Sequence, residues 1–558
     1  MRGQALNSLH IVRWADGRVP GVMPNAPSGF GTTPIIGVRR PTPVISFTKA
    51  MRRRTFLHHT LVGSAAFGLT ERLSASAARL PRKPNLIVFL PDQQRADTLA
   101  PYGRGRTHAP NLNKLASQAT VFDRAYVTQP VCTPSRSSLM TGLWPHQSGC
   151  TENNQPLAAN CQTLPELVAD PDYRCAYFGK WHLGDEVFAQ RGFHDWISIE
   201  DIYQDHFSAG REQGRISDYS RFLLEKGLKP DVPARGTFSR KFASRLPIEL
   251  SKPVFLERHA CDFLERYRRQ PFILFVSFLE PHTPYFGPLN NEHRPDEVEF
   301  DANVTHTFGE DLPLKYRLKQ EGQAVEYGRT PEDFRPIKRN YMGLVTQIDR
   351  SIGGVLKKLD DLGLTDDTIV VHTSDHGDMM GSHRLFEKEV MFEESVRVPY
   401  LVRLPGQRRP NRIAPAVSHI DFVPTMLDLI GRPAHAQCAG RSLAPALRGE
   451  LLRPKPVFLQ WSPKPGRNER VKKDSVLASA DDIARVCGES TRTVITADGW
   501  KLSLRDADRA ELYHLPRDPG ELRNLLPAAP AGVVPRLASL VREWQKASGD
   551  KLELAAVP

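Results

Sequence analysis

Short, mostly apolar runs recur along the chain from residue 85 onward. The runs at 85–90, 272–279 and 368–373 are typical of strands buried on both faces of a parallel sheet. Further strands are predicted at 121–127 and 173–179. The sequence therefore predicts a sheet whose central strands lie inside the protein.

Between these runs the apolar residues adopt a helical spacing. Helices are predicted at 110–119, 164–169, 254–267 and 337–362. In the last of these, apolar side chains recur every three or four residues from Ile337 to Leu359, which gives the helix one apolar face. Strands that alternate with helices predict an α/β fold with a largely parallel sheet between helices.

The pattern changes after the Pro-rich, basic segment at 445–456. Short extended segments are predicted at 457–461, 492–496, 501–504 and 511–514, and a final helix at 533–546. These elements predict a small antiparallel sheet packed by one helix. We therefore divide the chain into a leader at 1–82, a large α/β domain at 83–455 and a small α+β subdomain at 456–558.

The charge is distributed unevenly along the chain. Residues 1–82 contain twelve Lys and Arg residues and two acids, which gives +10 and leaves +2 of the total net charge of +12 for the remainder. A basic patch for nucleic acid is therefore not expected in the folded part. The remaining composition, 40% hydrophobic and 25% charged, is ordinary for a globular protein.

The leader resembles an export signal. Met51 to Leu57 contains the R-R-x-F-L pattern of twin-arginine signals, an apolar stretch follows at 61–69, and Ala75-Ser76-Ala77 suits cleavage. We expect a periplasmic or secreted protein, with Met51 as a possible true start; the alternative is a disordered basic tail. No segment reaches about 18 apolar residues, so stable membrane insertion is not expected.

The densest motif begins at Cys132 and reads C-x-P-S-R-x-x-L-x-T-G up to Gly142. Pro134 suits the first turn of a helix, and Gly142 suits the position just after its end. The start of the helix would offer free N–H groups and partial positive charge to an anion, and Arg136 would add a cation one turn later. Cys132 therefore lies where an oxyanion could be held. The six other cysteines could form disulfides in an exported protein or remain buried thiols.

Acidic residues follow two of the predicted central strands. Asp92-Gln93 comes after the run at 85–90, and Asp375-His376 comes after the run at 368–373. Each Asp alone could simply cap a helix. If the two strands are neighbours, however, the carboxylates converge at one edge of the sheet and form a site for Ca²⁺, or alternatively Mg²⁺.

Three further segments complete a family pattern: Gly179-Lys180-Trp181-His182, Glu280-Pro281-His282, and Lys388 after Phe386. Together with the Cys132 motif, they resemble the formylglycine-dependent sulfatases of the alkaline-phosphatase-like superfamily. The resemblance implies that a maturation system oxidises Cys132 to Cα-formylglycine. It also implies that Asp92, Gln93, Asp375, His376 and the modified Cys132 bind the metal ion.

The family mechanism implies a role for each catalytic residue. One hydroxyl of the hydrated aldehyde at position 132 would attack sulfur, while Arg136, Lys180 and Lys388 balance the sulfate charge. His282 would protonate the departing alcohol, and His182 would take the proton that allows sulfate to leave. We expect a sulfated small molecule or glycan as substrate, with a carbohydrate favoured, and substrate choice in the polar, irregular segments at 185–250 and 286–335.

Two alternatives remain open at this point. Many relatives have two adjacent acids at the first metal motif and Asp-Asn at the second, whereas this chain has Asp92-Gln93 and Asp375-His376. This departure occurs in some sulfatases and also in the related phosphonate monoester hydrolases, so a phosphonate or phosphodiester hydrolase is one alternative. The other is a non-catalytic glycan-binding protein in which Cys132 is never oxidised.

Overall fold

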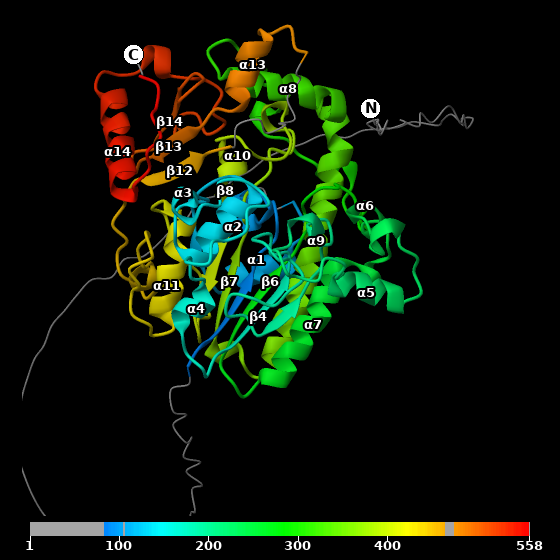
Figure 1. Ribbon diagram of the computed structural model, residues 1–558. Coiled ribbons are helices and arrows are strands. Elements are labelled where there is room, and N and C mark those ends of the chain that lie inside the picture. The colour runs from blue at the N-terminus through cyan, green and yellow to red at the C-terminus, as the bar shows by residue number, and fades with distance from the viewer. Residues whose placement is uncertain (1–82, 104–105, 464–473, 557–558) are drawn as a thin grey trace, which may run out of the picture. The chain divides into compact units, whose positions relative to one another are not determined.

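The computed structural model describes residues 83–103, 106–463 and 474–556 (Figure 1). The predicted leader, with its export motif, lies outside the described residues. Within the described part, no helix combines the length and the apolar character needed to cross a membrane.

A sheet of eight strands in the order β10-β2-β9-β7-β1-β6-β4-β5 forms the centre of the large α/β region. Its strands are β1 (Asn85–Phe89), β2 (Thr120–Phe122), β4 (Arg174–Gly179), β5 (Asp195–Ile197), β6 (Phe272–Ser277), β7 (Thr368–Thr373), β9 (Tyr400–Arg403) and β10 (Asn411–Ile413). Strand β1 pairs in parallel with both β6 and β7, in registers that place Ile87 beside Leu274 and Val370. Only β9 runs antiparallel to its two neighbours, β2 and β7.

Alternate residues of β1 enter two different hydrophobic cores. Leu86 and Val88 pack on the side of α2 (Cys132–Thr141), α4 (Leu164–Val168) and α11 (Phe422–Leu429). Ile87 and Phe89 pack on the side of α1 (Pro110–Ala116), α7 (Lys252–Tyr267) and α9 (Pro331–Asp361). Helices therefore cover both faces of the sheet (Figure 1), as the apolar runs predict.

Two smaller sheets complete the architecture. One has three strands, β3 (Ala125–Tyr126), β8 (Arg397–Val398) and β11 (Val417–Ser418). The other is an antiparallel sheet of β12 (Val457–Trp461), β13 (Thr491–Ile495), β14 (Trp500–Arg505) and β15 (Glu511–His514), packed by α14 (Val533–Ser548). The predicted fold class is therefore confirmed, whereas the exact boundary at 455/456 stays a prediction.

The single strand predicted at 121–127 is wrong, because the chain leaves one sheet for another at Asp123. This residue donates its N–H to Ile413 O, and its carboxylate pairs with Arg412. The polar pair Asp123-Arg124 thus separates β2 from β3.

Two other expectations also need correction. Helix α9 begins six residues before the predicted start at Ile337, because Thr330 and Asp333 form a capping box at its N-terminus. The segments at 185–250 and 286–335, expected to be irregular, contain α5 (Asp218–Glu225), α6 (Arg240–Ala243) and α8 (Leu314–Tyr327). The remaining described α-helices are α3 (Pro145–Ser148), α10 (Glu393–Val396), α12 (Ala444–Leu447) and α13 (Ala480–Cys487).

Candidate functional site

The carboxyl ends of β1 and β7 bring Asp92 and Asp375 to the start of α2. Helix α2 begins at Cys132 and ends at Thr141, and the next residue, Gly142, adopts the left-handed conformation with φ 70°. The Cys132 Sγ atom lies 3.3 Å from His376 Nε2 and 3.8 Å from Asp92 Oδ1. Residues separated by more than 240 positions thus meet at one buried point.

Arg136 and Lys180 hold the outer oxygens of the two carboxylates. Arg136 Nε donates to Asp375 Oδ2 at 2.8 Å and its Nη2 to Asp92 Oδ2 at 3.2 Å. Lys180 Nζ donates to Asp92 Oδ2 at 2.6 Å and lies 3.6 Å from Cys132 Sγ. Both Oδ2 atoms are therefore bound to cations, while the Oδ1 atoms remain directed toward His376.

This arrangement suits a divalent cation. His376 Nε2 lies 3.6 Å from Asp92 Oδ1 and 3.7 Å from Asp375 Oδ1. Its other nitrogen, Nδ1, is 3.0 Å from Gly377 O, and such a contact is common for a histidine that uses its second nitrogen as a ligand. Asp92, Cys132, Asp375 and His376 form a buried group whose ligand atoms lie within 4.8 Å of one another. Carboxylate oxygens and imidazole at this spacing can hold a metal ion.

Neighbouring charges determine the protonation states of Asp92 and Lys180. Burial raises the pKa of Asp92, but Lys180, His282 and Arg136 outweigh it, so the net pKa lies well below its usual value. Burial lowers the pKa of Lys180, but the carboxylate of Asp92 outweighs it, and the net pKa is raised. Asp92 is thus ionised and Lys180 protonated at neutral pH.

Gln93 and Lys388 lie in an adjoining network. The Gln93 amide nitrogen donates to Tyr285 Oη at 2.9 Å and to Asp378 Oδ2 at 2.5 Å, and Lys388 Nζ donates to Gln93 Oε1. The Gln93 N–H also donates to Asp375 Oδ1 at 3.0 Å. The network fixes Gln93 beside the metal-binding group, and its role as a ligand stays a prediction.

His182 is buried and His282 is partly buried, and both rings are neutral at pH 7. Burial lowers the pKa of His182, and the positive charges of Lys180 and Arg136 lower it further. Burial and Lys388 have the same effect on the pKa of His282. His282 Nδ1 lies 2.9 Å from Thr283 O, and His182 Nε2 lies 2.8 Å from Asn154 Oδ1. Each ring therefore has one nitrogen held and one left for chemistry.

Sequence reasoning missed Tyr203 and Arg240, which come from the polar insertion at 185–250. Tyr203 stacks on His182 with ring centroids 4.2 Å apart, and its hydroxyl lies 3.4 Å from His182 Nδ1. Arg240 Nη2 donates to the Tyr203 hydroxyl at 3.0 Å, and its Nη1 lies 3.5 Å from His282 Nδ1. No motif marks either residue; their only signal is that the insertion was expected to lie over the catalytic face.

Four other polar residues of the large α/β region make contacts within the fold. Asp349 accepts hydrogen bonds from the start of α1, and Asp421 accepts one from Arg441 N. His383 stacks on Phe392 with ring centroids 4.0 Å apart, and Arg384 donates to Thr307 Oγ1. All seven cysteines are free thiols.

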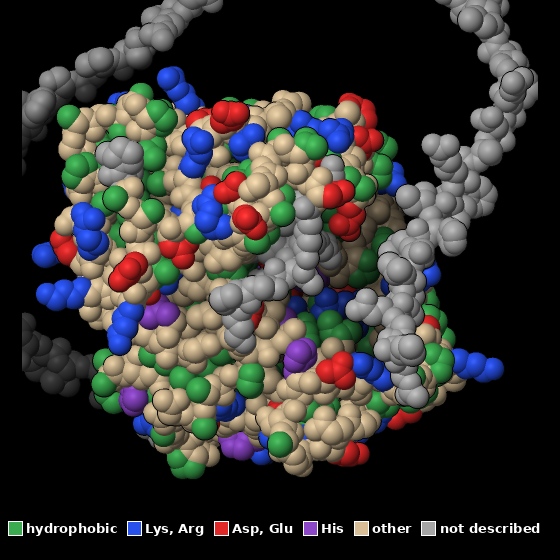
Figure 2. Space-filling view, turned by 45° about the horizontal axis from the view of Figure 1, so that its top comes forward, with side chains coloured by type: hydrophobic (Ala, Val, Ile, Leu, Met, Phe, Trp, Pro, Cys, Tyr) green, Lys and Arg blue, Asp and Glu red, His purple; other side chains and the backbone are tan. Residues whose placement is uncertain are grey.

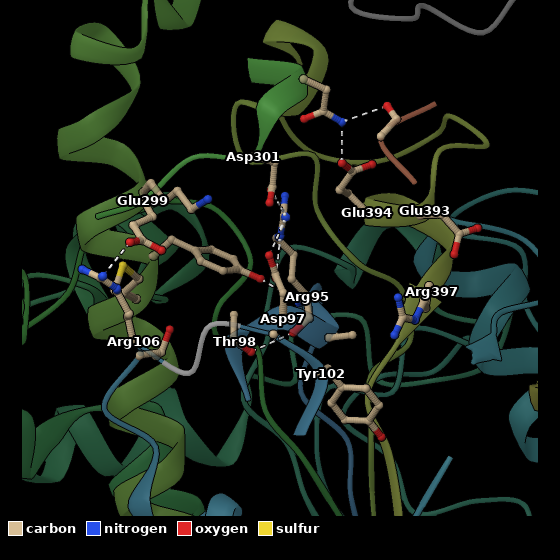
Figure 3. Close-up of a pocket in the computed structure, with 18 of the residues that line it drawn as sticks. Arg95, Asp97, Thr98, Tyr102, Arg106, Glu299, Asp301, Glu393, Glu394 and Arg397 are labelled. Carbon is tan, nitrogen blue, oxygen red and sulfur yellow. Dashed lines mark hydrogen bonds and ion pairs between the residues drawn. The ribbon is translucent and has the colours of Figure 1, made fainter. Parts of the chain in front are cut away.

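A cavity of about 390 Å³ lies elsewhere, and none of the predicted catalytic or metal-binding residues lines it. Arg95, Asp97 and Asp301 meet at its wall, and Arg106 pairs with Glu299 on its other side (Figure 3). Figure 2 shows one hollowed face of the molecule, where histidine and Lys or Arg side chains gather. Because the cavity shares no lining residue with the group around Cys132, we distinguish the candidate catalytic centre at Cys132 from this cavity, which we call the Arg95 cavity.

Comparison with known proteins identifies the family of this chain. The sulfatase family model matches residues 84–432. An N-acetylglucosamine-6-O-sulfatase of Bacteroides thetaiotaomicron is 25% identical over 536 residues, covering 83% of this chain and 87% of the relative. An ulvan-active sulfatase of Formosa agariphila is 30% identical over 365 residues, covering 62% of each protein.

Solved structures share the fold. One, described as a complex with its substrate D-glucosamine-2-N,6-O-disulfate, has a TM-score of 0.64 and 23% identity, covering 84% of this chain and 99% of that one. A phosphonate monoester hydrolase of Agrobacterium radiobacter has a TM-score of 0.66 and 21% identity, covering 84% and 96%. The family match spans most of the chain and includes every predicted catalytic residue, so this protein belongs to the sulfatase family and hydrolyses sulfate esters.

Proposed function

We propose that this protein removes sulfate from a carbohydrate, with Cys132 converted to Cα-formylglycine and Ca²⁺ bound beside it. The observation that carries the proposal is the position of Cys132. Its side chain starts α2 and lies between His376, Asp92 and Lys180. A formyl group at this position would therefore face two carboxylates and two fixed cations.

Asp92, Asp375 and His376 would hold the calcium ion, with Gln93 as a further candidate ligand. The modified residue and the cation together supply an activated hydroxyl nucleophile at neutral pH. The oxygen-rich donor set favours Ca²⁺ or Mg²⁺, and the imidazole of His376 does not exclude either.

Fixed cations balance the charge of the sulfate group. Lys180 and Arg136 are held by Asp92 and Asp375, and Lys388 is held by Gln93. These groups do not have to reorganise when charge moves toward the leaving oxygen. Each such group typically contributes about 3–4 kcal/mol to transition-state stabilisation.

The two histidines would handle protons. His282 has Nδ1 held by Thr283 O, so its Nε2 is the nitrogen available to the leaving alcohol. Lys388 contributes to the low pKa of His282, and a bound sulfate anion counteracts this effect, which allows His282 to carry the proton. His182 has Nε2 held by Asn154, which leaves Nδ1, next to Tyr203, as its basic nitrogen.

The names of several relatives support a carbohydrate substrate. They include an N-acetylglucosamine-6-O-sulfatase, an ulvan-active sulfatase and a Δ4,5-hexuronate-2-O-sulfatase. The insertion that carries Tyr203 and Arg240 reaches both catalytic histidines, so it offers polar and aromatic contacts to a sugar ring. We also propose export by the twin-arginine route, supported by the R-R-x-F-L motif after Met51.

Mass spectrometry of the peptide around Cys132 tests the nucleophile. Co-expression with a formylglycine-generating enzyme should lower the peptide mass by about 18 Da relative to the thiol. A matured protein that retains the thiol but turns over sulfate at the full rate would contradict the proposal.

A substrate panel tests the chemistry. Sulfated mono- and oligosaccharides should be hydrolysed with higher kcat/KM than a phosphonate monoester or a phosphodiester, and Cys132→Ala should remove every activity. A preference for the phosphonate would favour the alternative suggested by Gln93 and His376. Binding of sulfated glycan without any turnover by the formylglycine form would favour a glycan-binding protein.

A further inference from the structure

A second group of possible metal ligands lies away from the catalytic centre. His108 comes just before α1, while His293 and Glu297 belong to the insertion at 286–335; Glu297 ends the short 3₁₀ helix Pro295–Glu297. Each offers a ligand atom, and these atoms lie within 4.8 Å of one another. Of the three residues, Glu297 also lines the Arg95 cavity, whereas His108 and His293 do not.

The unpaired ring nitrogen of His293 is independent evidence for a bound ion at this group. Its side chain is fully buried, and its Nδ1 has no hydrogen-bond partner among the described residues. Its Nε2 lies 3.0 Å from Thr346 Oγ1. Burial disfavours the protonated ring, and a neutral imidazole has one nitrogen with a free lone pair.

That lone pair faces a carboxylate. His293 Nδ1 lies 3.8 Å from Glu297 Oε2, and His108 Nε2 lies 3.8 Å from the same oxygen. If Nε2 of His293 carries the proton for Thr346, then His293 Nδ1 and the Glu297 carboxylate are two acceptors that lie close together with no proton between them. A cation between them would satisfy both, and the second imidazole lies at the same distance.

From this juxtaposition we infer that His108, His293 and Glu297 form a second metal site, distinct from the catalytic one, that binds Zn²⁺ in preference to Ca²⁺. Two imidazoles and one carboxylate are a donor set that suits Zn²⁺ better than Ca²⁺. Ligand atoms around a tetrahedral zinc ion with normal bonds are about 3.3 Å apart. The two separations from Glu297 Oε2 are 3.8 Å, slightly longer than this, and all three ligand atoms lie within 4.8 Å of one another.

The charged residues around His108 and Glu297 leave room for a bound metal ion. Glu297 Oε2 also accepts the N–H of Arg294 at 2.8 Å, and Arg294 Nη1 lies 3.4 Å from Oε1. A carboxylate has about four lone-pair positions, so these contacts leave room for a metal bond. Glu292 lies 3.5 Å from His108 Nδ1 and pairs with Arg350, and it can support His108 from the outer side.

A metal here would connect two segments that are distant in sequence. The ion pair of Arg106 with Glu299, at 2.6 Å, already joins the same two segments at the cavity wall (Figure 3). The zinc ion would add a second, stronger connection. Its expected role is to stabilise the insertion, and it takes no part in sulfate hydrolysis.

Metal content measured in excess Ca²⁺ tests the inference. After incubation with Zn²⁺ and gel filtration, the wild-type protein should retain one zinc ion that His108→Ala and His293→Ala each lose. His108 is exposed, so His108→Ala tests the site even if His293→Ala does not fold. His435→Ala, which removes an exposed histidine elsewhere, should retain the ion.

A catalytic-site variant separates this site from the first one. Asp375→Asn should keep the additional zinc ion, and Zn²⁺ should raise the Tm of the wild type but not of His108→Ala. Co²⁺ substitution should give the visible absorption of a four-coordinate ion that His108→Ala abolishes. The inference fails if the wild type binds no additional ion, or if Asp375→Asn loses it while His108→Ala retains it.

Discussion

Two buried arginines, Arg136 and Arg95, each join two aspartates, but their surroundings differ. The guanidinium of Arg136 contacts Asp92 and Asp375, and all three side chains are at most 1% exposed. Arg95 contacts Asp97 at 2.7 Å and Asp301 at 2.8 Å, and these aspartates are 37% and 33% exposed. Charges that water cannot reach interact more strongly, so only the Arg136 group can exert a large electrostatic effect on a bound anion.

The balance of positive and negative side chains also differs between the Arg95 cavity and the site at Cys132. The Arg95 cavity is lined by four Lys or Arg residues and six carboxylates, and burial raises the pKa of one of these, Glu394. In the catalytic centre, Arg136, Lys180 and Lys388 surround the carboxylates that would bind a divalent cation. A sulfate group is therefore favoured at Cys132 and repelled from the cavity. Fixed positive charge, and not cavity volume, is therefore the property that supports the proposed substrate site at Cys132.

Removal of the nucleophile should have the largest effect. We expect Cys132→Ala and Cys132→Ser to reduce kcat by at least about 10⁴-fold, as loss of a covalent nucleophile does in other hydrolases. Steady-state assays with a sulfate ester measure this loss. Cys261→Ala, which removes a partly buried thiol, should retain wild-type activity. Multiple turnover by purified Cys132→Ser at the wild-type rate would contradict the proposed mechanism.

Replacing one aspartate partner of each arginine by asparagine should affect activity only at the Arg136 site. Asp375→Asn should lower kcat/KM by about 10³-fold, because it removes a proposed metal ligand and a partner of Arg136. Bound calcium should fall in parallel, as elemental analysis can show. Asp301→Asn should leave kcat/KM and calcium content nearly unchanged and cost about 1 kcal/mol of stability. Equal losses in both variants would show that the Arg95 cavity contributes to catalysis.

Removal of Lys388, one of the cations proposed to balance the sulfate charge, should have a smaller effect on activity. Lys388→Met should reduce kcat/KM by about 10²-fold, because one cation near the sulfate is lost. Lys338→Met, at the wall of the Arg95 cavity, is the matched control and should leave kcat/KM unchanged. Salt titration of kcat/KM for the two variants would provide a second measurement. An unchanged Lys388→Met enzyme would exclude this lysine from sulfate binding.

Glu186 should give the smallest effect, and one that depends on pH. It accepts the N–H groups of Trp181 at 2.8 Å and His182 at 2.7 Å, and burial raises its pKa to about 7. Glu186→Gln turns an amide toward one of these donors, which should cost about 1 kcal/mol of unfolding free energy at pH 7.

The pH trend follows from the raised pKa of Glu186. The folded protein keeps this proton up to about pH 7, whereas an unfolded glutamate loses it near 4.5. The stability that this proton provides is complete below pH 4.5 and is lost as the pH rises toward 7. The difference in unfolding free energy between the wild type and Glu186→Gln should therefore widen as the pH falls. Urea unfolding at several pH values measures this gap. Glu394→Gln should show a similar trend without altering kcat, and a gap that narrows toward low pH would contradict the assignment.

The sequence by itself determined the central strands, the helix that starts at Cys132 and the acids that follow β1 and β7. These features depend on local patterns: apolar runs, a helix-terminating glycine, and side chains placed directly after strands. Because parallel strands end at the same edge of a sheet, neighbouring strands were enough to predict that Asp92 and Asp375 meet. The resemblance to sulfatases added Lys180, His182, His282 and Lys388.

Only the tertiary structure decided which residues from the polar insertions reach these groups. The placement of Tyr203 against His182, the turn at Asp123 and the convergence of His108 with His293 all depend on contacts between segments distant in sequence. No periodicity records such contacts, because they arise from how whole elements pack. Local order is thus encoded in neighbouring residues, whereas the surroundings of the site follow from burial of the complete chain.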